Sequence, residues 1–161
     1  MPHFTFPSTG TDNSRASFTL IELLIVIGIL GILAAAVVLV LNPVELIKQG
    51  RDAARVSDLN SIDKALNLYA VDGGTSFGAA NKVYVSLPDD ASTSCASLSL
   101  PPLPSTWSYA CVTQANLRKI DATGWLPVNF SSIIQGSPLA VLPLDPDNKA
   151  STGNYYTYVT G

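Results

Sequence analysis

The most unusual titratable side chain in this chain stands inside its most apolar stretch. Residues 18–41 read FTLIELLIVIGILGILAAAVVLVL, and Glu22 is the only ionisable side chain among them. A carboxylate in lipid or in a protein core costs free energy unless it is paired or lies near the boundary of the apolar layer. Glu22 therefore needs either a cationic partner or a position at the surface of the layer, and these two alternatives stay open.

The other residues that carry chemistry argue against an enzyme. His3 is the only histidine, so a chain that has lost its first residues has none for a Ser-His or Cys-His pair. Cys95 and Cys111 are the only cysteines, and two cysteines cannot complete a four-ligand zinc site. We predict that they form a disulfide in an oxidising compartment; the alternative is two free thiols.

Two aspartates near the C-terminal end lie in an oxygen-rich loop. Asp145 and Asp147 stand with Asn148 in the segment LPLDPDNKASTGN. Carboxylate and amide oxygens are ligands that calcium prefers, so Asp145 and Asp147 are a candidate calcium site. The same residues are ordinary turn formers, and a plain turn is the alternative. A second acidic pair, Asp89 and Asp90, is interpreted as a solvated loop.

Composition restricts the class of protein. The chain has 161 residues, 47% hydrophobic and 13% charged, with a formal net charge of -3. No basic stripe is present, so no nucleic-acid partner is expected. The 18–41 run exceeds the roughly 20 helical residues that span a bilayer. These features predict a single-pass membrane protein with a small domain attached.

The elements follow from hydrophobic periodicity. Residues 1–17 are a polar leader, and 18–41 are a transmembrane helix that ends before Pro43, where a kink is expected. Residues 42–74 form an amphipathic helix, which ends at Gly73-Gly74. Its apolar positions recur at spacings of three and four residues, which predicts one buried helix face: Leu59, Ile62, Leu66 and Tyr69.

Residues 75–161 are predicted to be a small β-rich globular head. Three segments alternate or are rich in β-formers, namely 82–87, 108–113 and 155–159, and loops broken by proline separate them. The fold class is therefore α+β: a long N-terminal helix, half transmembrane and half amphipathic, packed on a small antiparallel sheet.

The N-terminal residues resemble a known family. The run Phe18-Thr19-Leu20-Ile21-Glu22 before a long apolar helix is similar, residue for residue, to the processing segment of type IV prepilins and type II secretion pseudopilins. The stretches DAARVSDL and LNLY resemble the second half of the long helix in the pseudopilin-like branch. Ser17 stands where the family usually has glycine.

The resemblance implies a maturation pathway. A prepilin peptidase would cut between Ser17 and Phe18, and the new Phe18 amine would be methylated. In the filament, Glu22 would pair with the Phe18 amine of a neighbouring subunit. Some pseudopilin heads also carry calcium in the loop that corresponds to Asp145 and Asp147.

The function expected from the resemblance is structural. The chain would be a subunit of a type IV pilus-like or type II secretion pseudopilus filament, with itself, an assembly platform protein and an ATPase as partners. The alternative is a minor pilin or a membrane-anchored binding or adhesin module. The resemblance places the head outside the cytoplasmic membrane, although Lys48, Arg51 and Arg55 follow the span and only Arg15 precedes it.

Overall fold

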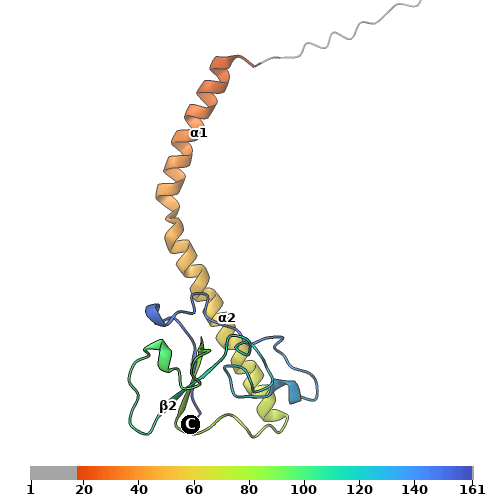
Figure 1. The fold of residues 1–161 in the computed structure, drawn as a ribbon. Coiled ribbons are helices and arrows are strands. Elements are labelled where there is room, and N and C mark those ends of the chain that lie inside the picture. Colours follow the sequence, from red (N-terminus) through yellow and green to blue (C-terminus); the bar gives the residue numbers. More distant parts are fainter. Residues whose placement is uncertain (1–17, 161) are drawn as a thin grey trace, which may run out of the picture. The chain divides into compact units, whose positions relative to one another are not determined.

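The structure is a computed structural model, and it describes residues 18–160. The predicted leader 1–17, with Ser17, lies outside the described residues. The chain divides into two compact units, which meet between Leu46 and Ile47 and are described separately below. Figure 1 shows the order of the elements along the chain. The predicted division into four domains stays a prediction.

The first unit contains helix α1, Leu20–Leu41, as the apolar sequence predicts. It ends at Asn42, whose left-handed backbone (φ 38°) cannot continue an α-helix. Helix α2, Pro43–Val71, begins at the next residue, where the missing N–H of proline costs no helical hydrogen bond. The predicted interruption near Pro43 is therefore present, as a break at Asn42.

The second unit is built around the rest of α2. The buried residues of α2 are Ile62, Ala65 and Tyr69, and they pack in one cluster with side chains that follow the strands, including Trp125, Phe130 and Leu142. The predicted face is correct for Ile62 and Tyr69, and Leu66 packs against the cluster. It is wrong for Leu59, which is 52% exposed.

The head carries three strands, and they form a mixed sheet. Strand β1 is Lys82–Pro88, β2 is Ser108–Val112 and β3 is Thr157–Tyr158, with the order β2-β1-β3. Strands β1 and β3 are antiparallel, but β1 and β2 are parallel. The prediction of an antiparallel sheet is thus wrong for the β1–β2 pair. The reason is that the segment between these strands returns to the start of β1 instead of forming a hairpin.

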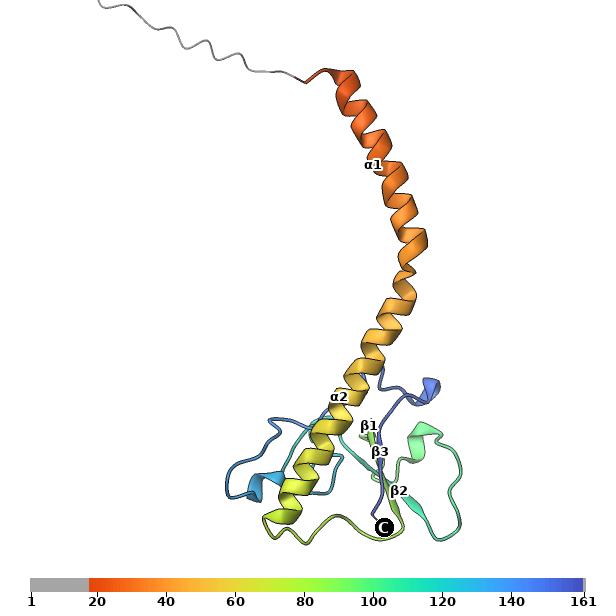
Figure 2. The same ribbon diagram turned by 180° about the vertical axis from the view of Figure 1, so that it is seen from behind.

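The sheet and the loops after β2 lie on different sides of α2 in both views of this unit (Figures 1 and 2). The side chains Val83, Val85 and Leu87 of β1 form a second cluster with the two cysteines. Ser86, on the opposite face of β1, is fully buried, and its hydroxyl accepts the Tyr156 N–H over 2.8 Å. The head therefore has two small cores, one against α2 and one around the cysteine pair. Three short 3-10 helices complete the elements: η1 (Ala96–Leu98), η2 (Phe130–Ser132) and η3 (Ala150–Thr152).

Candidate processing and assembly site

Glu22 lies in the first turn of α1, where it forms a reciprocal cap with Thr19. The Thr19 N–H and hydroxyl donate to Glu22 Oε2 over 2.9 and 2.8 Å, and the Glu22 N–H donates to the Thr19 hydroxyl over 3.3 Å. This is a capping box, in which two of the helix's unpaired N–H groups are satisfied. The Glu22 carboxylate also lies at the helix end where the backbone dipole favours an anion.

The partner of Glu22 within its own chain is therefore Thr19, to which the sequence interpretation assigned no separate role. The signal was present in the sequence, because Thr followed three residues later by Glu ahead of an apolar run is a typical helix start. All three of these hydrogen bonds are exposed. A cation supplied by another molecule can therefore reach the carboxylate without breaking a packed core.

Phe18 stands immediately before the cap and is 87% exposed. Its proposed role in processing depends on the bond to Ser17, which lies outside the part of the chain that the structure describes. The cleavage and methylation roles of Ser17 and Phe18, and the assembly role of Glu22, stay predictions.

The surface of α1 is apolar on every side. None of its 22 residues is buried, and Glu22 is its only ionisable residue. It is about 33 Å long at the rise of an α-helix, enough for a hydrocarbon layer about 30 Å thick. Within residues 18–160 it is the one helix whose length and composition suit a membrane span. This helix is compatible with membrane anchoring.

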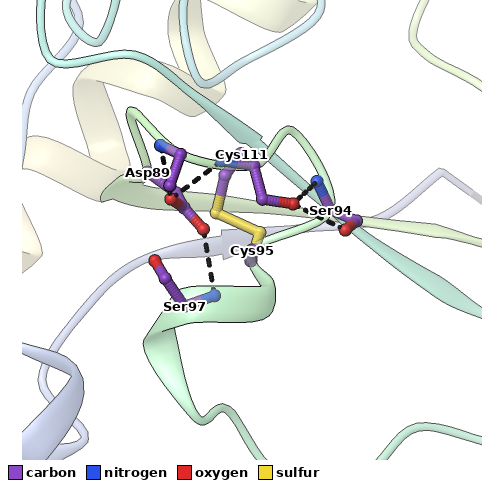
Figure 3. Close-up of a disulfide and its surroundings, with 7 residues drawn as sticks. Asp89, Ser94, Cys95, Ser97 and Cys111 are labelled. Atoms are coloured by element: carbon purple, nitrogen blue, oxygen red, sulfur yellow. Dashed lines mark hydrogen bonds between the residues drawn. A yellow bond between two sulfur atoms is a disulfide. The ribbon is translucent and has the colours of Figure 1, made fainter.

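The predicted cysteine pair forms a disulfide in the head, shown in Figure 3. The Cα atoms of Cys95 and Cys111 are 5.3 Å apart, and both residues are buried. The backbone holds the same segments together without the sulfurs, because the Cys111 N–H donates to the Thr93 carbonyl over 2.9 Å. The disulfide therefore closes a loop whose two ends already lie side by side.

Asp89 holds the N-terminal end of that loop in place through hydrogen bonds. The interpretation of Asp89 as part of a solvated loop is therefore wrong. Asp89 is 5% exposed, and its Oδ1 accepts the N–H groups of Ala91 and Ser92, both over 3.0 Å. Its Oδ2 accepts the Ser97 N–H over 3.3 Å, a bond visible in Figure 3. Burial alone would raise the pKa of Asp89, but the hydrogen bonds from Ser97, Ala91 and Ser92 outweigh burial and hold the pKa below its usual value.

The candidate calcium ligand Asp145 already has a cationic partner. The Arg55 Nε and Nη2 atoms of α2 donate to its two carboxylate oxygens over 2.6 and 3.2 Å. Its Oδ1 also accepts the backbone N–H groups of Asp147 and Asn148. The hydrogen bonds from Arg55 hold the pKa of Asp145 below its usual range; burial opposes them, and the two backbone donors assist.

The other candidate ligand, Asp147, faces different partners. Its Oδ2 accepts hydrogen bonds from Thr152 over 2.8 Å and Asn154 over 3.2 Å, and Lys149 Nζ lies 3.7 Å from Oδ1. The described residues 18–160 contain no group of three His, Cys, Asp or Glu side chains arranged to hold a metal ion. A calcium ion at Asp145 would have to displace the Arg55 guanidinium, so the donors as arranged do not fit one. The calcium site itself stays a prediction.

One comparison with known proteins identifies a segment of the chain. The model of the prokaryotic N-terminal methylation motif matches residues 12–38, which include Phe18, Thr19 and Glu22. Neither the curated proteins nor the solved structures contain a significant match to this chain. A motif of this class implies processing by a prepilin peptidase. The match confirms the predicted resemblance of this segment to the prepilin-type cleavage and methylation segment.

Proposed function

We propose that this chain is a structural subunit of a type IV pilus-like or type II secretion pseudopilus filament and is not an enzyme. One observation carries the proposal: the methylation motif covers the cap and most of a helix whose only ionisable residue is Glu22. A simple membrane anchor needs no carboxylate in that position. A subunit that must align with its neighbours does need one.

In this proposal, Glu22 sets the axial register between neighbouring subunits. Cleavage after Ser17 creates an amine on Phe18, and the amine of one subunit pairs with the Glu22 carboxylate of the next. In a low-dielectric filament core, an axial shift leaves both charges without partners, and breaking such a pair costs about 3–5 kcal/mol. The pair therefore fixes the register, while the apolar surface of α1 supplies the attraction between subunits.

The proposal assigns a location and a set of partners. Before assembly, α1 spans the cytoplasmic membrane with the head outside, a compartment in which the Cys95–Cys111 disulfide is stable. A prepilin peptidase matures the chain, and a platform protein with its ATPase extends the filament. The α1 helices form the filament core, and the heads form its surface.

A second candidate, a minor pilin or membrane-anchored binding module, is favoured by a hollow in the head. Its volume is about 470 Å³, and it lies in the loop that the disulfide closes. Trp107, Tyr109 and the segment 99–105 line it, which combines aromatic rings with serine hydroxyls. Immunogold electron microscopy separates the two candidates, because a main subunit is labelled along the whole filament and a minor one only at its end or at intervals.

Mass spectrometry of the mature N-terminus tests the proposed function directly. The expected chain begins at Phe18 and is one methyl group heavier than the unmodified sequence. Ser17→Gly is the matched variant, since it restores the family's usual residue, and it should be processed at the same bond. An intact leader on the chain in purified filaments, or an unmodified internal start site, would overturn the proposal.

A further inference from the structure

The loops after β2 enclose a hollow that has no role in the function proposed above. Its volume is about 550 Å³, and both its cationic and its apolar lining residues come from two short segments. The cations are Arg118 and Lys119, both exposed, and the apolar lining is Ala115, Ile120, Ala140 and Val141. The hollow suits a ligand surface that combines carboxylates with aliphatic side chains.

Hydrogen bonds within the head fix the walls of this hollow. Arg118 and Leu142 are joined twice, because the Leu142 N–H donates to the Arg118 carbonyl over 2.9 Å and Arg118 Nε donates to the Leu142 carbonyl over 3.1 Å. The Phe130 N–H donates to the Ile120 carbonyl over 2.8 Å. The carboxylate of Asp121, which also lines the hollow, accepts hydrogen bonds from the Thr123 hydroxyl and N–H. The backbone that carries both cations, and the Arg118 side chain, are thus held in a preformed frame.

Helix α2 carries the complementary surface. Asp52, Val56, Leu59 and Asp63 recur at spacings of four, three and four residues, so they form one stripe along the helix, here called the α2 stripe. All four are exposed, and Val56 and Leu59 are 62% and 52% exposed. The Val56 and Leu59 side chains are in contact with water, and burying them against another apolar surface would be favourable. The stripe places two aliphatic side chains between two carboxylates.

We propose that the α2 stripe of one copy of this chain docks into the basic hollow of the next copy. Asp63 meets Lys119, and Val56 and Leu59 cover Ile120 and Val141, while Asp52 keeps its ion pair with Arg55 of its own copy. The two surfaces share no residue, so the contact is head-to-tail and each copy keeps one free surface at either end of a chain of copies. Contacts of this kind build open helical filaments when they do not close into a ring. The inference rests on the proposed filament function and adds a contact between the heads.

A charge exchange tests the pairing in cells that assemble the full chain. Lys119→Glu and Asp63→Lys should each lower the amount of sedimented filament by on the order of tenfold, because each places like charges opposite one another. The combination of both variants should restore the amount to within about twofold of the native chain. Lys64→Glu is the control, because Lys64 is an exposed cation on α2 outside the stripe. Unchanged melting temperatures show that the heads of all variants fold.

Cross-linking tests the geometry independently of charge. The native cysteines are both in the disulfide, so a short bismaleimide reacts only with introduced thiols. The double variant Leu59→Cys with Val141→Cys should give a ladder of linked copies, whereas each single variant should give none. A dimer from a single variant would reveal a symmetric contact and contradict the proposal. Leu59→Cys with Ser151→Cys is the control pair.

The outcomes separate the two proposals. Filaments with a methylated Phe18, but with no ladder and no restoration by the charge exchange, would overturn the docking of the stripe and leave the proposed function standing. Absence of processing and of filaments would overturn the proposed function. A ladder that forms between membrane-embedded chains without filaments would still support the head-to-tail contact.

Discussion

Arg55 and Asp145 are 90 residues apart in sequence, and Arg55 Nε lies 2.6 Å from Asp145 Oδ2. The pair joins α2 to the loop before η3. Its two side chains differ in exposure, because the Asp145 side chain is 3% exposed and the Arg55 side chain is 26% exposed. A second polar contact, from the Tyr156 hydroxyl to Asp58 Oδ2 over 3.0 Å, joins α2 to the residue before β3. The burial of Asp145 makes its carboxylate dependent on Arg55 and on the backbone N–H groups of Asp147 and Asn148.

Asp145→Asn should destabilise the head. The amide cannot accept two hydrogen bonds from Arg55 in the same geometry, and hydrogen bonds to charged groups contribute about 1.5–3 kcal/mol. The free energy of unfolding should fall by about 2 kcal/mol, measured by urea denaturation of the purified chain in detergent. The control is Asp147→Asn, at a less buried neighbouring carboxylate, which should cost less. Equal losses for both variants would contradict the assigned role of the Arg55–Asp145 pair.

The stability of the head should depend on pH in the acidic range. The pKa values of Asp145 and Asp89 are both lowered in the folded chain, so folding favours their ionised forms. Their contribution is present above the unfolded-state pKa of about 3.9 and is lost as the pH falls through the lower folded-state values. Thermal melts should therefore be nearly constant from about pH 7 to pH 5 and fall below about pH 4. In Asp145→Asn this acidic loss should be smaller.

Removal of the disulfide should weaken the head without unfolding it. Closure of the loop between Cys95 and Cys111 contributes about 3 kcal/mol in the chain-entropy model. The bonds from Ala91, Ser92 and Ser97 to Asp89, and from Cys111 to Thr93, do not involve the sulfurs, so they should persist in the reduced chain. The double variant Cys95→Ser with Cys111→Ser should melt at a lower temperature with an unchanged far-UV circular dichroism spectrum. A gain of two hydrogen atoms on reduction, measured by mass spectrometry, verifies the bond in the native chain.

Glu22→Gln separates the charge of this residue from its capping role. Glutamine serves as well as glutamate in a capping box, so the start of α1 and membrane insertion should be unaffected. Filament assembly should nevertheless fail, because the Phe18 amine loses its anionic partner. Thr19→Ala is the reciprocal variant, since it removes the cap and keeps the charge; it should reduce assembly much less. Normal filaments from Glu22→Gln, observed by electron microscopy, would refute the alignment role.

The predicted calcium site at Asp145 and Asp147 has a simple thermal test. A bound ion stabilises the folded chain by mass action, by about 2.7 kcal/mol when calcium is at 100 times its dissociation constant. If the site binds calcium, the melting temperature rises with added calcium and falls with a chelator, and Asp147→Asn abolishes the change. If neither calcium nor a chelator changes the melting temperature, the predicted calcium site is wrong and Arg55 is the cationic partner of Asp145.

The sequence predicts local features of this fold well and non-local ones poorly. The extent of α1 follows from an uninterrupted apolar run, and the break follows from Pro43. The buried face of α2 was misplaced at Leu59 because large apolar residues alone do not orient the helix. Arg55 and Asp58 turn toward the head through Asp145 and Tyr156, partners 90 and 98 residues away.

The sequence also did not predict the direction of β2 or the environment of Asp89, because both depend on contacts outside the local segment. The alternation of residues 82–87 and 108–113 indicates strands, but it carries no information on whether they run parallel. Asp89 looks like an exposed loop residue until Ala91, Ser92 and Ser97 fold back over it. The match to the methylation motif, by contrast, depends on a contiguous run, which is why the processing segment could be identified before the structure.

The loop between Cys95 and Cys111 has one further consequence, for engineering. Its ends are anchored by the sulfur bridge, by the Thr93–Cys111 backbone bond and by Asp89, whereas Ser99, Pro101, Pro102 and Ser105 at its tip are exposed. Between these anchors, Leu100 and Leu103 still pack against the cysteine cluster, and the Pro101 carbonyl accepts the Tyr109 hydroxyl, so Ser105 is the better position for a change at the tip. If the proposed filament forms, foreign peptides inserted at Ser105 would be displayed once per subunit, at a cost that consists mainly of loop entropy.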